Sequence, residues 1–182
     1  MNNDTQTVSI ARRLIDKYKT RNPEEIAEAL GIQIMRVFDF IRQKGTFKLI
    51  LNVPFIFVNG NLSNQMQRMV IAHELGHAIL HRDICLETGG MLEFELFDMV
   101  NHTEHDANVF QATLLIDEKE FLGYLQEGYD LVAVAKLMDV NVNLLLLKSE
   151  LMNKENSEYN FNLPYVPKSD FLGTIEDNAG EL

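Results

Sequence analysis

The pentapeptide His73-Glu74-Leu75-Gly76-His77 constrains the fold of this chain more than any other segment. It lies within the run Asn64–His81, which Ser63 precedes as a good helix N-cap and in which apolar residues recur at helical spacing. Side chains four residues apart share one face of a helix, so both histidines can offer ring nitrogens to a single Zn²⁺. Glu74 would then lie beside the metal and could take a proton from bound water. The pentapeptide therefore predicts a zinc hydrolase.

Gly76 is an unfavourable residue for the middle of this helix, because glycine there costs about 1 kcal/mol relative to alanine. We therefore expect something to approach the helix closely at Gly76, either the substrate or a neighbouring strand. Without a metal, the two histidines would be ordinary helix residues that hydrogen-bond to backbone carbonyls or to water.

Composition and charge restrict the class of protein. The chain has 182 residues, 46% hydrophobic and 24% charged, which is typical of a soluble protein with one core or one core and a small appendage. Its one cysteine, Cys85, excludes an intramolecular disulfide and fits a reducing compartment. We expect Cys85 to have no role in the chemistry, and the minor alternative is that its thiolate binds the metal. The first residues lack the pattern of a signal peptide and no stretch reaches the roughly 18 apolar residues of a membrane helix, so we expect a cytoplasmic protein. The net charge of -11 disfavours a broad grip on nucleic acid and favours a basic protein partner.

The N-terminal half predicts two helices followed by a small sheet. A helical pattern spans Val8–Tyr18, and Asn22-Pro23 begins a second helix that Gly31 closes. Segments rich in β-branched and aromatic residues follow at 32–38, 46–51 and 55–58, and we expect them to form a small antiparallel sheet that leads into the motif helix. After that helix, the irregular stretch 82–102 is long enough to be a functional loop that covers a metal cleft.

The C-terminal half predicts further helices. Thr103 is a good N-cap for one helix, and Asp117 for another that ends near Leu125. Two short helices at 131–138 and 142–152 have the length and spacing of a helix-turn-helix. The second of them has one lysine and no arginine with which to read guanine edges, so we expect it to pack on the core or on a partner protein. Beyond Asn153 we expect an extended tail.

A third metal ligand must come from outside the motif helix, because catalytic zinc sites typically use three protein ligands and keep a fourth position open. Asp83 stands where a third histidine of the extended motif would be, which leaves a residue from a downstream helix. The acidic candidates are Glu104 and Asp106, and His102 and His105 lie close by in sequence. Spacing alone does not choose among these four.

The motif followed by Leu80-His81, together with the segment Glu104-His105-Asp106-Ala107-Asn108-Val109-Phe110, resembles the ImmA/IrrE family of metallopeptidases. In that family the second segment follows the pattern Glu-x-x-Ala-Asn-x-Phe-Ala, and its glutamate is the third zinc ligand. The resemblance implies that Glu104 is this ligand, that Asn108 hydrogen-bonds a ligand side chain, and that His81 supports the site without binding the metal. Asp106 would cap a helix or face solvent, His105 would lie on the surface or line the cleft, and His102 could contact the substrate or the oxyanion. The sequence departs from the pattern at Gln111, where the family usually has alanine.

The resemblance covers about residues 22–117 and, more loosely, continues to about residue 152. It implies an α+β fold of the minimal zincin (gluzincin-like) type over residues 1–128, in which the sheet packs on the motif helix and on a second, ligand-bearing helix. Residues 129–153 would be a helix-turn-helix-like segment packed on this core, and residues 154–182 the tail. The implied function is a cytoplasmic zinc endopeptidase that cuts a helix-turn-helix repressor of a phage-like or mobile element or of a stress regulon. The alternative is a catalytically quiet module that binds a repressor without cutting it, and a DNA-binding regulator ranks third.

Overall fold

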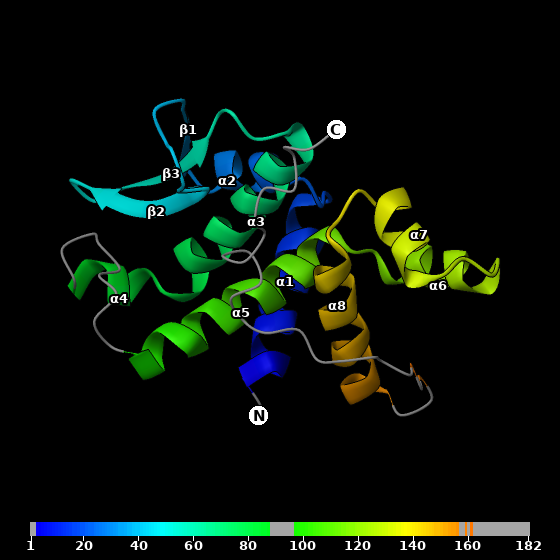
Figure 1. Cartoon of the computed structure of the whole chain (residues 1–182). Coiled ribbons are helices and arrows are strands. Elements are labelled where there is room, and N and C mark those ends of the chain that lie inside the picture. Colours follow the sequence, from blue (N-terminus) through cyan, green and yellow to red (C-terminus); the bar gives the residue numbers. More distant parts are fainter. Residues whose placement is uncertain (1–2, 88–96, 157–158, 160, 162–182) are drawn as a thin grey trace.

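The computed structural model describes residues 3–87, 97–156, 159 and 161, and over these the chain has the predicted α+β class (Figure 1). None of the described helices combines the length and the apolar character that a membrane crossing requires. In chain order the elements are α1 (Asn3–Tyr18), α2 (Pro23–Ala29), β1 (Gln33–Val37), β2 (Gly45–Ile50), β3 (Val53–Asn59), α3 (Asn64–Leu80), α4 (Arg82–Glu87), α5 (Phe97–Leu115), α6 (Glu118–Gln126), α7 (Leu131–Leu137) and α8 (Val142–Glu155).

The sheet is mixed, with the strand order β1-β3-β2, so the prediction of a wholly antiparallel sheet is wrong for β1. Strands β2 and β3 form an antiparallel hairpin whose two turn residues, Leu51 and Asn52, both have positive φ, as this tight turn requires. Strand β1 pairs in parallel with β3, because β3 inserts between β1 and β2. The chain reverses direction between β1 and β2 and between β2 and β3, as predicted. The position of β3 between the other two strands was not predicted from the sequence. The side chain of Asn59 holds the β1–β2 connection in place by donating to the carbonyl oxygens of Phe40 and Gln43.

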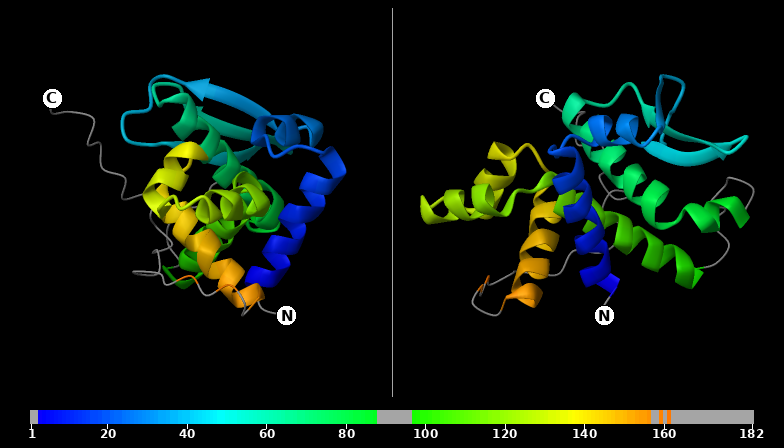
Figure 2. Two further views of the ribbon diagram at one scale, coloured as in Figure 1. Left: turned by 90° about the vertical axis from the view of Figure 1, so that its right-hand side faces the viewer. Right: turned by 180° about the vertical axis from the view of Figure 1, so that it is seen from behind.

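Helix α3 carries the pentapeptide and lies between the sheet and α5 (Figures 1 and 2). It begins as predicted, since the Ser63 hydroxyl accepts from the backbone N–H of Met66 at 3.2 Å. Because α3 is covered on both sides, most of its residues between 67 and 78 are buried. The motif is therefore held in the interior of the molecule rather than on its surface.

Two helix starts differ from the prediction. Helix α1 begins at Asn3 rather than at Val8, and α5 begins at Phe97 rather than after Thr103. Thr103 is not an N-cap but a buried residue inside α5, whose packing against α1 and α3 outweighs the local capping signal. The expected loop at 82–102 therefore includes α4 and the first six residues of α5, while its middle, residues 88–96, lies outside the described residues.

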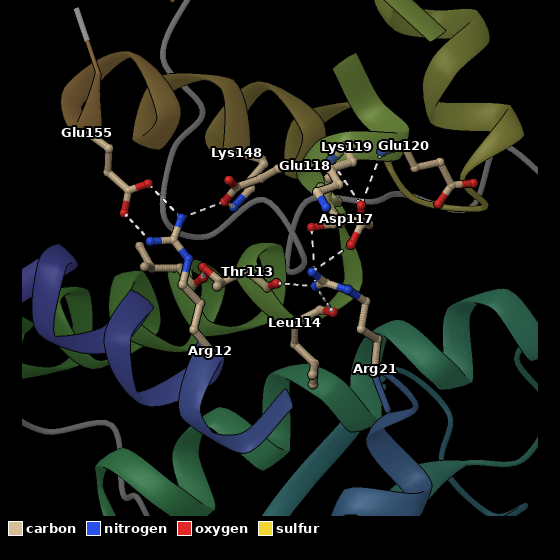
Figure 3. Close-up of polar contacts among 12 residues, drawn as sticks. Arg12, Arg21, Thr113, Leu114, Asp117, Glu118, Lys119, Glu120, Lys148 and Glu155 are labelled. Carbon is tan, nitrogen blue, oxygen red and sulfur yellow. Dashed lines mark hydrogen bonds and ion pairs between the residues drawn. The ribbon is translucent and has the colours of Figure 1, made fainter. Parts of the chain in front are cut away.

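The C-terminal helices begin at N-caps whose side chains accept from backbone N–H groups of the following turn. Asp117 was predicted as such a cap, whereas Asp130 and Asn141 were not. Helix α8 packs on α5 and contributes leucines to the same hydrophobic core as α3. A chain of ion pairs fastens it to the N-terminal helix (Figure 3). Within this series of ion pairs, Lys148 is only 1% exposed and lies 2.6 Å from Glu118. Arg12 of α1 binds both Glu118 and Glu155.

Candidate metal centre

The site is built at a close approach between α3 and α5. A Cβ atom placed on Gly76 would lie 3.1 Å from Cα of Ala107 and 3.3 Å from its carbonyl oxygen. The close approach predicted at Gly76 is thus present, but its partner is the backbone of α5 rather than a strand or a substrate. Glu104, one turn before Ala107 on α5, is brought beside the two motif histidines by this contact.

Three side chains converge at this crossing. The Nε2 atoms of His73 and His77 are 3.1 Å apart, and each lies close to one carboxylate oxygen of Glu104, at 3.1 Å and 3.3 Å respectively. Both histidines are buried, whereas the side chain of Glu104 is 34% exposed. Two ligand candidates are therefore fixed by packing, and the third faces the solvent side, where a substrate could enter.

The spacing of these atoms fits a bound metal ion. Donor atoms that surround a metal tetrahedrally at about 2.0–2.1 Å lie about 3.3 Å from one another. The separations of 3.1–3.3 Å among His73, His77 and Glu104 agree with this value. In the described part of the chain, these three residues form the group of histidine, cysteine and acidic side chains that could hold a metal ion.

The tautomer of His73 also suits a metal. Its Nδ1 atom lies 3.0 Å from the side-chain oxygen of Asn108, which can only accept a hydrogen bond. Nδ1 of neutral His73 therefore carries the proton, and Nε2 presents a lone pair to the oxygen of Glu104. Two acceptors at this distance need a cation or a proton between them, and the contact predicted for Asn108 is of the kind that orients metal ligands.

Electrostatics separate the two glutamates of the site. Burial raises the pKa of Glu104, but the hydrogen bonds that it accepts from His73 and His77 when their facing nitrogens are protonated outweigh burial and hold the pKa well below its ordinary range. For His73 the net shift of the pKa is upward. Burial alone would lower the pKa of this histidine, but the hydrogen bond to Glu104 and the charge of Glu74 outweigh burial and raise the pKa above its ordinary value. Glu104 is thus ionised under all ordinary conditions, as a ligand carboxylate must be.

Glu74 lies beside the two histidines on α3 and also contacts strand β2 of the sheet. The backbone N–H of Phe47 in β2 donates to its carboxylate, and burial raises its pKa above the ordinary value despite the opposing effect of His77 and His73. Gly45 of the same strand leaves room for α3, since a Cβ there would collide with Cγ1 of Val70 and lie 3.3 Å from Cγ of Glu74. A carboxylate with a raised pKa beside a metal site is suited to accept and return a proton.

Four other residues that the sequence suggested for the site lie on α5 or at the C-terminal end of α3. His81 is buried, and its Nδ1 lies 3.1 Å from Nδ1 of the ligand candidate His77. Asp106 was expected to cap a helix or face solvent, but its side chain is 13% exposed and lies beside His81. His105 lies at the surface of α5 and pairs with Asp4 at 2.8 Å. His102 is exposed and makes none of the contacts that join the three ligand candidates in the described structure.

A small α+β core with a His-Glu-x-x-His helix and an acidic donor on the neighbouring helix is typical of one class of metallopeptidases. The chain belongs to the Peptidase M78 family, because the model of its IrrE N-terminal-like domain matches residues 27–149. It is also 35% identical over 144 residues to "Uncharacterized immunity region protein 2" of Bacillus phage phi105, an alignment that covers 78% of this chain and 89% of the phage protein. The resemblance found in the sequence is thereby confirmed.

Proposed function

We propose that this chain is a zinc endopeptidase that hydrolyses a peptide bond in a protein substrate in the cytoplasm. The convergence of His73, His77 and Glu104 within 3.1–3.3 Å carries the proposal. The donor set supports zinc, because two imidazoles and one carboxylate are a common set of protein ligands in catalytic zinc sites. Partial exposure of Glu104 supports a catalytic rather than a structural site, since a structural site is closed by a fourth protein ligand.

When bound, zinc would supply a Lewis acid that polarises the scissile carbonyl and makes water more acidic. Glu74 would accept the proton from the attacking water and deliver it to the leaving amine, a task that its raised pKa favours. The N–H of Phe47 would hold the carboxylate in position between these two transfers. His73 and His77 would be kept in place by their buried positions on α3.

Strand β2 offers a place for the substrate backbone. It is an edge strand of the sheet, and the N–H of Phe47 points toward Glu74 rather than toward β3. Exposed edges of sheets can pair with an extended peptide. A substrate segment lying along β2 would pass directly in front of the general base.

The substrate we propose is a basic DNA-binding repressor. The similar phage protein is named for an immunity region, and the net charge of -11 on this chain favours a basic partner. Direct DNA binding by residues 142–152 is disfavoured further by the structure, because Lys148, the basic residue of that segment, is buried against Glu118.

Cleavage of the repressor encoded beside the gene for this chain tests the proposal. The zinc-loaded protein should cut it at one site, and a chelator should stop the reaction. The Glu74→Gln protein should retain zinc without cutting, while Glu28→Gln on the exposed face of α2 should cut normally. A repressor that binds the wild-type protein and stays intact would support the alternative of a catalytically quiet binding module.

A further inference from the structure

The two motif histidines have different partners at the ring nitrogen that faces away from Glu104. His73 contacts the neutral amide of Asn108, whereas His77 contacts a second histidine, His81, at 3.1 Å between the two Nδ1 atoms. Nε2 of His81 in turn lies 3.6 Å from the carboxylate of Asp106, close enough for an ionic contact but longer than a direct hydrogen bond. The side chains of His81 and Asp106 are 7% and 13% exposed.

One proton lies between the two Nδ1 atoms, and its position decides whether His77 can bind a metal. If His77 donates, its Nε2 is a free lone pair that faces Glu104, and Nε2 of neutral His81 carries a proton toward Asp106. If His81 donates, neutral His77 carries its proton on Nε2, where a metal would bind, and a lone pair of His81 faces the carboxylate. The charge of Asp106 favours the first arrangement, because it attracts the proton on His81 and repels the lone pair.

Asp106 is itself held by the N-terminal helix. Nδ2 of Asn3, in the first turn of α1, donates to both carboxylate oxygens of Asp106, at 2.7 Å and 2.8 Å. The next residue, Asp4, binds His105 of α5 at 2.8 Å and so fixes the same turn of α1 against α5. A continuous line of contacts thus runs from the start of the chain to the inner face of the metal centre.

We propose that Asp106, His81 and Asn3 are positioning residues that set the metal-binding tautomer of His77. The proposal rests on the metal centre of the proposed function, but not on peptide hydrolysis. It adds a role for Asp106, one of the four residues among which spacing alone did not choose a third ligand, and for Asn3, which lies about one hundred residues away in sequence.

Zinc affinity, measured by competition with a chromophoric chelator, is the first test. Asp106→Asn should weaken zinc binding by about 10–100-fold, because the amide can donate to His81 and stabilise the wrong tautomer. Asn3→Ala should give a smaller loss. The matched controls are Asp83→Asn and Thr5→Ala, which remove a similar group at exposed positions and should bind zinc as the wild type does.

Two variants of His81 separate hydrogen bonding from packing. His81→Leu should weaken zinc binding by about 10–100-fold. His81→Gln should recover part of this loss, because its side-chain oxygen can accept the proton of His77 Nδ1. Equal losses in the two variants would show that His81 acts by packing alone and would overturn the proposal.

The ring tautomers of the metal-free protein provide a readout that a packing defect would not move. The carboxylate of Glu104, 3.3 Å from Nε2 of His77, attracts the proton to Nε2 in the metal-free protein, in wild type and variant alike. Long-range ¹H–¹⁵N NMR spectra at mildly alkaline pH should therefore show a larger share of His77 protonated on Nδ1 in the wild type than in Asp106→Asn. An unchanged His77 tautomer, or Asp106→Asn zinc binding equal to the wild type, would overturn the proposal. Because neither measurement involves a substrate, failure to find proteolysis would count against the proposed function alone.

Discussion

Replacing Gly76 with alanine tests whether the spacing of α3 and α5 determines metal binding. The added Cβ would lie 3.1 Å from Cα of Ala107, 3.3 Å from its oxygen and 3.3 Å from Cβ of Phe110. Two of these atoms belong to the backbone of α5, so no side-chain rotation can relieve the contact. The helices must instead move apart by a few tenths of an ångström.

Two opposing effects fix the magnitude. Alanine improves helix propensity by about 1 kcal/mol, whereas overpacking a core typically costs about 1–3 kcal/mol. We expect Gly76→Ala to lower the free energy of unfolding by about 1 kcal/mol, equivalent to about 2–4 °C in Tm for a chain of this size. Metal sites tolerate about 0.2 Å in ligand distance. Since Glu104 moves with Ala107 on α5, zinc affinity should fall by on the order of tenfold, or about 1.4 kcal/mol.

Gly123→Ala is the matched control, because Gly123 lies inside helix α6 and a Cβ there would meet nothing within 4 Å. It should raise stability by about 1 kcal/mol and leave zinc affinity unchanged. Stability is measured by urea unfolding with far-ultraviolet circular dichroism, since the chain has no tryptophan, and with chelator present so that zinc does not contribute. If Gly76→Ala is stabilised as Gly123→Ala is and binds zinc normally, the helix spacing does not control the site.

Three further predictions concern the ligands and the ion pairs. Glu104→Ala should lose zinc binding and cleavage together, whereas Glu74→Gln loses cleavage alone, as equilibrium dialysis beside a cleavage assay will detect. Glu118→Gln should lower the free energy of unfolding by about 3 kcal/mol, because it leaves the buried charge of Lys148 without its partner, while Lys148→Met should cost much less; equal costs in urea unfolding would contradict this reasoning. Burial raises the pKa of Glu118, but Lys148 and Arg12 outweigh it and hold the pKa at about 2, below the ordinary 4.5. Because the folded-state pKa is the lower one, this stabilisation is present above about pH 4.5 and is lost as the pH falls toward 2, so Glu118→Gln should flatten the acid limb of a stability–pH curve.

Local signals in the sequence identify most of the elements and the motif. Asn22, Ser63 and Asp117 cap helices at the predicted points, because capping depends on a side chain and the turn that follows it. The histidine pair follows from helical periodicity in the same way. Features that depend on neighbours close in sequence were therefore predictable.

Features that depend on contacts across the fold were not. The insertion of β3 between β1 and β2 is a matter of topology, and no turn residue encodes it. Thr103 carries a capping signal that the packing of α5 overrides. The surroundings of Asp106 were missed because its partners are Asn3 and His81, both distant in sequence. Division of the chain at residues 128 and 153 stays a prediction.

One face of α5 meets α3 at the metal centre and carries Glu104. Glu104, Ala107, Asn108 and Gln111 follow the spacing i, i+3, i+4 and i+7 of a single helix face. Gln111 donates to the carbonyl oxygen of Met69 in α3 at 2.8 Å, while its own side-chain oxygen is the buried one that lacks a partner in the described structure. Alanine, which the family pattern has here, would remove both the bond and the unpaired oxygen and would leave a cavity that lowers stability. It would not push the helices apart. Alanine at position 111 leaves the helix spacing intact, whereas alanine at position 76 does not. Gly76→Ala should therefore lower zinc affinity, and Gln111→Ala should leave it unchanged. This result would assign control of the spacing to the contact between Gly76 and Ala107 rather than to the hydrogen bond of Gln111.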